Sequence, residues 1–537
     1  MLSLKPLTVL GLLQNIIMTP ENIDDSSSVP NITRREFLAA AGSLSAAEIA
    51  GGEVKILAQT SPKLRPEAEL CFKDAVELSR MIRTREVTAV EVMTAFLAQI
   101  KRVNPKVNAI PTFIGEEAAM RAAKDADEHL AKGRVPGPLH GFPHAVKDLM
   151  ATAGIRTTQG SPIYQDFVPT SDALLVERLK TAGAIIIGKT NTPEFGAGSH
   201  TFNQIFGATR NPYDLTKSCG GSSGGAAATL ACGMLPLADG SDMGGSLRNP
   251  ASFCNVVGFR SSPGRVPSYP NSMAWNPLSV EGGLARTVQD LAFFMSVLAG
   301  PDSRAPLSLN EPSWIFSRPL ARDFRQTKIA WSRNLGRYPV QPVVNEVCDK
   351  ARSVFAALGC QVEDGEPDFR DADEIFQTLR AWSFAQNRAD DYKNHRVQLK
   401  DTIIWNVEKG LQLKGTDISR AEAKRTQLYN RVHEFMERYE FLVLPVSQVV
   451  PFPVETDWVH EINGTKMETY IDWMATCYAI TVTGLPAISV PCGFTPEGLP
   501  VGLQIVGRHQ RDFDVLQLAY AFEQATQDGK RRPAISL

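Results

Sequence analysis

The chain has 537 residues, of which 43% are apolar and 21% charged, and its formal net charge is −2. These values are typical of a soluble globular protein and argue against the basic surface that binding to nucleic acids or anionic membranes requires. The eight cysteines and eight histidines form no CxxC, HExxH or zinc-finger spacing. We therefore expect no disulfide scaffold, no metal site and no cofactor.

The first 60 residues differ in composition from the rest, and we interpret them as a leader. Residues 33–38, TRREFL, precede a small, weakly apolar run at 39–50, which resembles a twin-arginine export signal. The alternative is an ordinary helix N-terminus with two arginines, which Glu48 inside the run favours. The apolar run at 7–17 is too short to span a bilayer. We expect a periplasmic protein without a stable membrane anchor, with a cytoplasmic location as the alternative.

Helices are expected at the start of the main domain, which we assign to residues 61–537. Thr88 and Glu91 have the spacing of a capping box. Apolar residues then recur at helical spacing until Asn104-Pro105, which should end the helix.

Two lysines follow segments that resemble strands. Residues 137–148 form a glycine- and proline-rich turn before a short apolar run that ends at Lys147, although a lone lysine is usually solvated. Residues 183–190, GAIIIGKT, match the P-loop pattern of nucleotide-binding proteins. The Ala-Ile-Ile-Ile segment favours a buried strand, however, and Pro193 disfavours the helix that must follow a P-loop directly. We predict a central strand here.

Residues 220–248 are the most distinctive stretch of the chain. Two serine clusters, Ser222-Ser223 and Ser246, lie among glycines and bracket an alanine-rich segment long enough for a short helix and a strand. Glycine lets main-chain N–H groups approach a substrate atom that a Cβ would block. A flexible linker is the alternative, but the apolar interior at 226–230 argues against it. The stretch therefore predicts a serine nucleophile beside an oxyanion pocket.

Strands and helices alternate along the rest of the chain. We expect a helix at 283–299, a more polar helical layer at 306–440, strands at 441–446, 484–490 and 501–506, and a final helix at 513–525. The alternation predicts an α/β fold with a single large mixed β-sheet covered by helices on both faces. We divide the main domain into a core at 135–305, a peripheral helical region at 306–440, and returning strands with the last helix at 441–537.

Several motifs together resemble those of the amidase signature family. They are AVKD at 145–148, GGSSGG at 220–225 and GSDMGGSLRNPA at 240–251, and the similarity covers nearly everything after residue 65. The resemblance implies the fold of that family and its Ser–Ser–Lys triad. The triad falls on Ser246 as nucleophile, Ser222 as bridging serine and Lys147 as base. A cis peptide bond at Gly221–Ser222 is also implied.

The chemistry of these residues agrees with the implied roles. A lysine can take a proton from a serine only when neutral, and burial lowers the lysine pKa toward that state. Ser222 can pass a proton between Ser246 and Lys147 and return one to the departing amine. The main-chain N–H groups of Met243, Gly244, Gly245 and Ser246 can hold the oxyanion, and Ser223, Asp242 and Arg248 are expected to support the site. The sequence departs from the family pattern at Ser241, Asn255 and Ser261, none of which belongs to the triad.

We expect an amidase that acts on a small-molecule amide, as a homodimer and without a nucleic-acid partner. One alternative is the glutaminase subunit of a tRNA-dependent amidotransferase, which shares the signature but acts in the cytoplasm. A second is an α/β-hydrolase esterase with Ser223 as nucleophile, because GSSGG also fits the GxSxG elbow. Its base would be one of His395, His433, His460 and His509. A third is a silent binding protein, against which the intact triad argues.

Residues 470–478 bear on the substrate. They are similar to the branch of the family that contains aryl-acylamidases, and their aromatic side chains are candidates for an acyl or aryl pocket. The alternative is that Trp473 and Tyr478 are core residues.

Overall fold

The computed structural model describes residues 69–134 and 137–537. The predicted leader at 1–60, with its twin-arginine motif, lies outside the described residues. Within the described ranges, none of the helices combines the length and the apolar character needed to cross a membrane.

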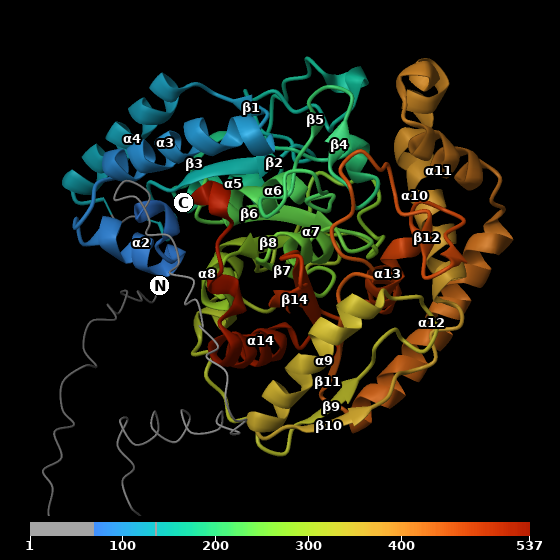
Figure 1. Ribbon diagram of the computed structural model, residues 1–537. Helices are drawn as coiled ribbons and strands as arrows, with labels where there is room; N and C mark the ends of the chain where they lie inside the picture. Colours follow the sequence, from blue (N-terminus) through green and yellow to red (C-terminus); the bar gives the residue numbers. More distant parts are fainter. Residues whose placement is uncertain (1–68, 135–136) are drawn as a thin grey trace, which may run out of the picture. The chain divides into compact units, whose positions relative to one another are not determined.

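An eight-stranded mixed sheet forms the centre of the fold (Figure 1). Its strands, in spatial order, are β10 (Gln361–Asp364), β9 (Lys328–Trp331), β11 (Phe441–Pro445), β15 (Pro500–Gly507), β14 (Ala487–Phe494), β7 (Val257–Arg260), β8 (Val280–Ala285) and β6 (Ala238–Asp242). Strands β10, β9 and β11 run parallel to one another. All other neighbouring pairs in this sheet are antiparallel, including the predicted pair β14 and β15.

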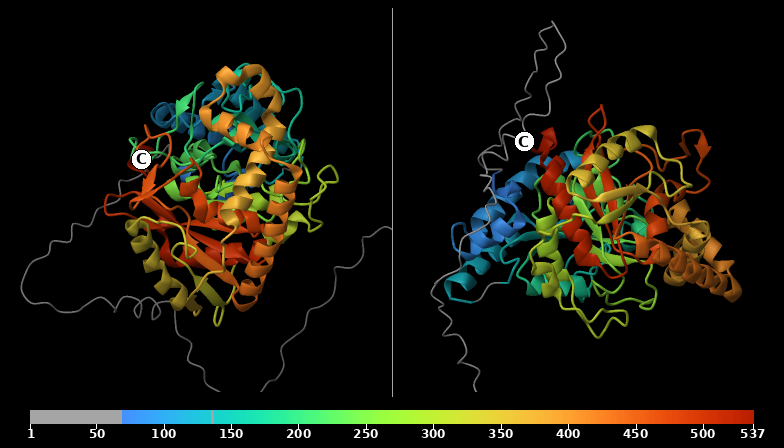
Figure 2. Two further views of the ribbon diagram at one scale, coloured as in Figure 1. Left: turned by 90° about the vertical axis from the view of Figure 1, so that its right-hand side faces the viewer. Right: turned by 90° about the horizontal axis from the view of Figure 1, so that it is seen from below.

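The two faces of this sheet pack against different helices, because alternate residues of a strand point to opposite faces. On β15, Val501, Leu503 and Ile505 belong to a core shared with α8 (Val288–Leu298), α9 (Pro342–Ala357) and α14 (Asp512–Thr526). Val506 belongs to a second core, shared with α10 (Ala372–His395), α12 (Gly415–Arg438) and α13 (Ala475–Thr483). The predicted α/β class, with a large mixed sheet between helical layers, is confirmed (Figure 2).

A separate three-stranded sheet carries both lysines of the sequence analysis. It comprises β1 (Thr112–Phe113), β3 (Ile185–Thr190) and β2 (Pro143–Lys147), with β3 in the middle. The P-loop-like segment forms β3 and is buried along its whole length, so the strand prediction is confirmed. Strand β2 ends at Lys147 and contacts β6 of the large sheet. This contact brings Lys147 to the Gly/Ser stretch.

Helices complete the layers around these sheets. Residues of α3 (Ala89–Val107) and α4 (Glu116–Ala131) share a core with β3, and residues of α2 (Ala75–Arg83) and α5 (Leu174–Thr181) share one with α8. Besides short 3-10 helices, the other elements of the described residues are α6 (Gly224–Ala231), α7 (Arg248–Phe253), α11 (Asp401–Leu411), the hairpin of β4 (Phe202–Asn203) and β5 (Gly207–Ala208), and the hairpin of β12 (Glu461–Ile462) and β13 (Thr465–Lys466). Elements α6 and β6 are the short helix and strand predicted within residues 220–248.

Helix α3 is longer than predicted at its C-terminus. It begins at the predicted capping box, in which the Thr88 hydroxyl accepts the Glu91 N–H, but it continues through Pro105 to Val107. A proline inside a helix removes one hydrogen bond and crowds the carbonyl four residues earlier. Here only two helical residues follow Pro105, and they stay helical. Asn108, which adopts the left-handed conformation, ends the helix instead.

Two other expectations are corrected. Residues 283–285 belong to β8, and the helix that follows starts after Thr287, whose hydroxyl accepts the N–H of Asp290 and caps the first turn. The range 306–440, expected to be a helical layer, also supplies β9 and β10, which extend the edge of the large sheet.

Candidate active site

Lys147 lies at the centre of a cluster of hydroxyl groups. Its Nζ is 2.8 Å from Ser222 Oγ, 2.8 Å from Ser223 Oγ and 3.1 Å from Ser241 Oγ. The lysine is fully buried. Burial lowers its pKa to about 7, against the opposing effect of the carboxylates of Asp239 and Asp242. The amine is therefore able to act as a base near neutral pH.

Asp239, on β6, holds the strand that carries this lysine. Its carboxylate accepts the main-chain N–H of Lys147 at 3.1 and 3.2 Å and the Nε2–H of His144 at 3.0 Å. Nothing in the sequence placed Asp239 in the site, and Ser241 stood out only as a departure from the family pattern. The only available signal was their position in the ADGSD strand just before the second serine cluster, and the contact between β2 and β6 was needed to interpret it.

Ser222 and Ser223 form the turn that leads into α6. The Gly221–Ser222 peptide bond is cis, as the family resemblance implies. The glycines of this turn allow close packing: a Cβ on Gly224 would lie 2.3 Å from Thr201 Oγ1, and one on Gly225 would lie 2.4 Å from the Asn191 nitrogen. Both serines are consequently held in buried positions beside Lys147.

Ser246 lies in the turn between β6 and α7 and is 8% exposed. Its carbonyl oxygen accepts the N–H of Ser223 at 3.2 Å, which places the two serine clusters side by side. The Ser246 hydroxyl makes no hydrogen bond with any other residue that the structure describes, so it is not joined to Ser222 directly. The structure therefore brings Ser222 and Lys147 into contact and leaves the third triad member adjacent with a free hydroxyl.

The carboxylate of Asp242 shapes the turn that was predicted to hold the oxyanion. Asp242 accepts the N–H of Gly245 at 2.9 Å and that of Leu247 at 3.1 Å. The Gly245 N–H is therefore engaged, and we remove it from the predicted oxyanion donors. The N–H groups of Met243, Gly244 and Ser246 have no partner among the described residues and stay as candidates.

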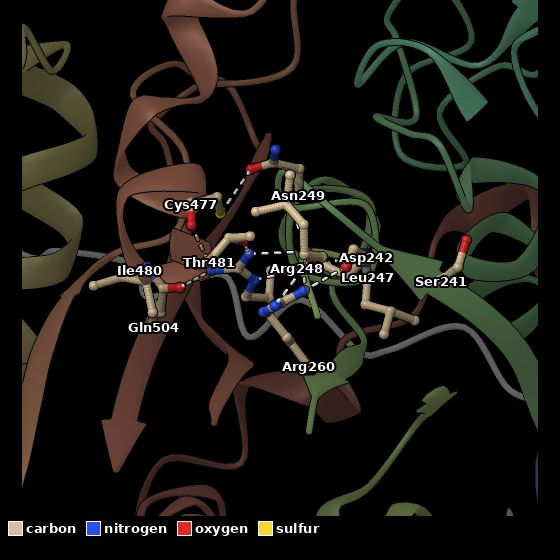
Figure 3. A network of polar contacts seen from close by, with 12 residues as sticks. Ser241, Asp242, Leu247, Arg248, Asn249, Arg260, Cys477, Ile480, Thr481 and Gln504 are labelled. Carbon is tan, nitrogen blue, oxygen red and sulfur yellow. Dashed lines mark hydrogen bonds and ion pairs between the residues drawn. The ribbon is translucent and has the colours of Figure 1, made fainter. Parts of the chain in front are cut away.

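Arg248 fixes Asp242 from the other side (Figure 3). Its Nε and Nη2 donate to the two carboxylate oxygens at 3.0 and 2.9 Å, and Nη1 reaches the Gln504 side chain at 2.6 Å. Arg260 also donates to the Asp242 carbonyl oxygen. Burial opposes ionisation of Asp242, but the two guanidinium groups outweigh it and hold the pKa of that carboxyl well below its usual range. The supporting roles expected of Asp242 and Arg248 match this geometry.

Replacing Arg248 by methionine is expected to lower the free energy of unfolding by about 3–5 kcal/mol, because the buried carboxylate of Asp242 loses one of its two cationic partners. The measurement is the urea unfolding midpoint. Arg325→Met is the matched control, because Arg325 is 81% exposed and pairs with Asp323 at the surface. Its midpoint is expected to stay unchanged. Equal midpoints for wild type and Arg248→Met would contradict the structural role.

The geometry around Ser223 does not fit the esterase alternative. Ser223 is fully buried, and the basic side chain within hydrogen-bond distance of its hydroxyl is Lys147. The four histidines considered as its base, His395, His433, His460 and His509, are all exposed.

The aromatic residues of the predicted substrate segment are all buried in one core. Trp473 is buried against Phe253 and Phe452. Tyr478 stacks on Phe376 with ring centroids 4.5 Å apart and donates to Asp373 at 2.8 Å. Both are core residues, which is the alternative that the sequence left open. Tyr470 belongs to the same core, and its hydroxyl accepts hydrogen bonds from Arg380 Nη2 and Asn406 Nδ2.

Comparison with known proteins identifies the family. The family model described as Amidase matches residues 91–516. An acylamidase of Rhodococcus erythropolis is 36% identical over 88% of this chain and 99% of its own length. A glutamyl-tRNA(Gln) amidotransferase subunit of Moorella thermoacetica is 35% identical over 87% of this chain and 100% of its own.

Solved structures agree with these sequence comparisons. The crystal structure of a bacterial aryl acylamidase of the amidase signature family has a TM-score of 0.80 and 31% identity, and it covers 85% of this chain and 98% of its own. A 6-aminohexanoate cyclic dimer hydrolase has a TM-score of 0.79 and 26% identity, with 87% of this chain covered and 100% of its own. With the buried Lys147–Ser222 pair and a family match over most of its length, this chain belongs to the amidase signature family.

Proposed function

We propose that this amide hydrolase forms an acyl-enzyme at Ser246, with Ser222 as the proton bridge and Lys147 as the base. The observation that carries the proposal is the 2.8 Å contact between Lys147 Nζ and Ser222 Oγ in a buried setting that lowers the lysine pKa to about 7. A surface lysine has a pKa near 10.4 and is almost entirely protonated at neutral pH. This one can accept a proton from its serine neighbour.

The reaction starts when neutral Lys147 takes the Ser222 proton while Ser222 takes the proton of Ser246. The Ser246 oxygen then bonds to the amide carbon, and the carbonyl electrons move onto its oxygen. The free N–H groups of the turn after Asp242 would stabilise that oxyanion, each by about 3 kcal/mol. The proton returns from Lys147 through Ser222 to the nitrogen as the C–N bond breaks. Water, activated by the same chain, then releases the acid from Ser246.

For substrate range, we propose acylamides of the kind that the acylamidase relatives are named for. A panel of 4-nitroacetanilide, a long-chain fatty amide, propionamide and glutamine tests this, with release of the amine or ammonia as the measurement. We expect the anilide to be cleaved with the highest kcat/KM of the four. A clear preference for glutamine would instead support the glutaminase alternative, which the similar amidotransferase sequences keep open.

We also propose export by the twin-arginine route, on the basis of Arg34 and Arg35 before the small apolar run at 39–50. Replacing both arginines by lysine should retain the protein in the cytoplasm of a bacterial host that has this pathway. Fractionation followed by immunoblotting measures the outcome, and equal periplasmic amounts for both forms would contradict export.

The expected homodimer also stays a prediction, which a monomeric mass by light scattering would contradict.

A further inference from the structure

Arg380, on α10, is a buried cation without an acidic partner. It is only 5% exposed, and no carboxylate of the described residues lies within ion-pair distance of it. The other three buried arginines of the described chain behave differently. Arg248 and Arg260 pair with Asp242, and Arg265 pairs with Asp512.

The neighbours of Arg380 place it beside the candidate oxyanion turn. Its Nη1 is 3.2 Å from the Met243 sulfur, and Met243 is the first residue of that turn. Its Nη2 donates to the Tyr470 hydroxyl at 2.6 Å. Phe376, one turn earlier on α10, packs so closely on the turn that a Cβ on Gly244 would lie 3.0 Å from its ring. The guanidinium therefore lies against the turn that carries Ser246.

Not every N–H group of the Arg380 guanidinium has a strong hydrogen-bond acceptor. Its Nε–H is buried and has no hydrogen-bond partner among the described residues, and the thioether that faces Nη1 is a weak acceptor. The guanidinium also lies 4.6 Å from the ring centroid of Phe384 and 5.7 Å from that of Tyr470. Contacts with aromatic rings recover part of the desolvation cost of a buried cation, whereas a carboxylate recovers more through charge-assisted hydrogen bonds. A buried guanidinium without a carboxylate partner, next to the candidate active site, is suited to bind an anionic group of the substrate.

We infer that Arg380 binds a carboxylate carried by the substrate, so that among anilides those with an additional anionic carboxylate on the acyl or amine part are preferred over their neutral counterparts. The free Nε–H would donate to that carboxylate, and Tyr470, bonded to Nη2, would hold the guanidinium in place. This inference rests on the proposed function, because it concerns the substrate of the Ser246 site. Arg380 acts here as a specificity-determining residue and takes no part in proton transfer.

Two matched substrate pairs test the inference. The acyl-side pair is the mono-4-nitroanilide of succinic acid and its methyl ester, and the amine-side pair is 4-acetamidobenzoate and its methyl ester. Wild type is expected to prefer the carboxylate in at least one pair by about 30-fold or more in kcat/KM, mainly through KM. Arg380→Met should abolish that preference while changing kcat/KM for the neutral ester by less than about threefold, and Arg380→Lys should restore part of it. Arg396→Met, at an exposed arginine just after α10, is the control and should keep the preference.

Several results would overturn the inference. One is a wild type without preference for the carboxylate in either pair. Another is an equal loss for both members of a pair in Arg380→Met, which would show that Arg380 only clamps Tyr470 and Met243. If circular dichroism shows that Arg380→Met does not fold, the substrate preferences of the wild type and of Arg380→Lys still test the inference. Cleavage of neutral anilides together with fluorophosphonate labelling of Ser246, but without a preference, refutes the inference alone. Absence of both activity and labelling refutes the proposed function as well.

Discussion

Ser246→Ala is expected to lose amide hydrolysis by about 10⁴-fold or more and to lose all labelling by a fluorophosphonate probe. The reason is that the probe and the substrate need the same oxygen, which is the one hydroxyl of the site without a hydrogen-bond partner among the described residues. The measurements are steady-state kcat on an anilide and the mass of the intact protein after exposure to the probe.

Ser223→Ala is the matched control for this experiment. The Ser223 hydroxyl is bonded to Lys147 and is fully buried, so it supports the base without meeting the substrate. Its loss should lower kcat and slow labelling while some labelling persists. The reverse pattern, with labelling lost in Ser223→Ala and kept in Ser246→Ala, would identify Ser223 as the nucleophile and restore the esterase alternative.

Amidase activity is expected to rise with pH through about 7 and then to level off. Burial lowers the pKa of Lys147 to about 7, so the neutral amine that the mechanism needs predominates above that pH and is lost below it. Below the midpoint, kcat/KM should fall about tenfold per pH unit, in proportion to the neutral fraction. Lys147→Met removes the base and should lower kcat by about 10²–10⁴-fold.

Lys189 supplies the control for this prediction. It is also fully buried, with its pKa lowered by burial to about 8, but its Nζ bonds to Thr152 Oγ1 and the Met150 carbonyl oxygen and not to a triad serine. Lys189→Met should reduce stability and leave the pH midpoint of the remaining active enzyme near 7. A wild-type midpoint near 10, or a midpoint that moves in Lys189→Met and persists in Lys147→Met, would contradict the role of Lys147.

The class of fold and the two serine clusters could be predicted from local patterns of the sequence, whereas Lys147 joined the candidate triad only through the resemblance to the amidase signature family. The isoleucine run of β3 excluded a P-loop, and the structure confirms the strand. The glycines around Ser222, Ser223 and Ser246 marked backbone that must pack closely. Predictions of where elements end were less successful. Pro105 did not end α3 at once, and the helix continues for two more residues to Val107.

Long-range contacts supplied the rest of the site. Nothing local to Lys147 distinguishes it from a surface lysine. The contact between β2 and β6 buries it among three hydroxyls, the setting that the proposed base needs. The position of Asp239 behind it depends on the same contact.

By itself, the sequence determined which residue types are available for the chemistry: two serine clusters in glycine-rich backbone and a lysine at the end of an apolar strand. Only the tertiary structure decided how these residues are arranged around one another. Asp242 engages the Gly245 N–H and so limits the oxyanion donors. Arg380 lies 137 residues from Met243 in the chain and meets it in space. The burial of a side chain, its pKa and the presence or absence of a counter-ion all depend on the residues packed around it. Because those residues come from distant segments of the chain, no single stretch of sequence reveals them.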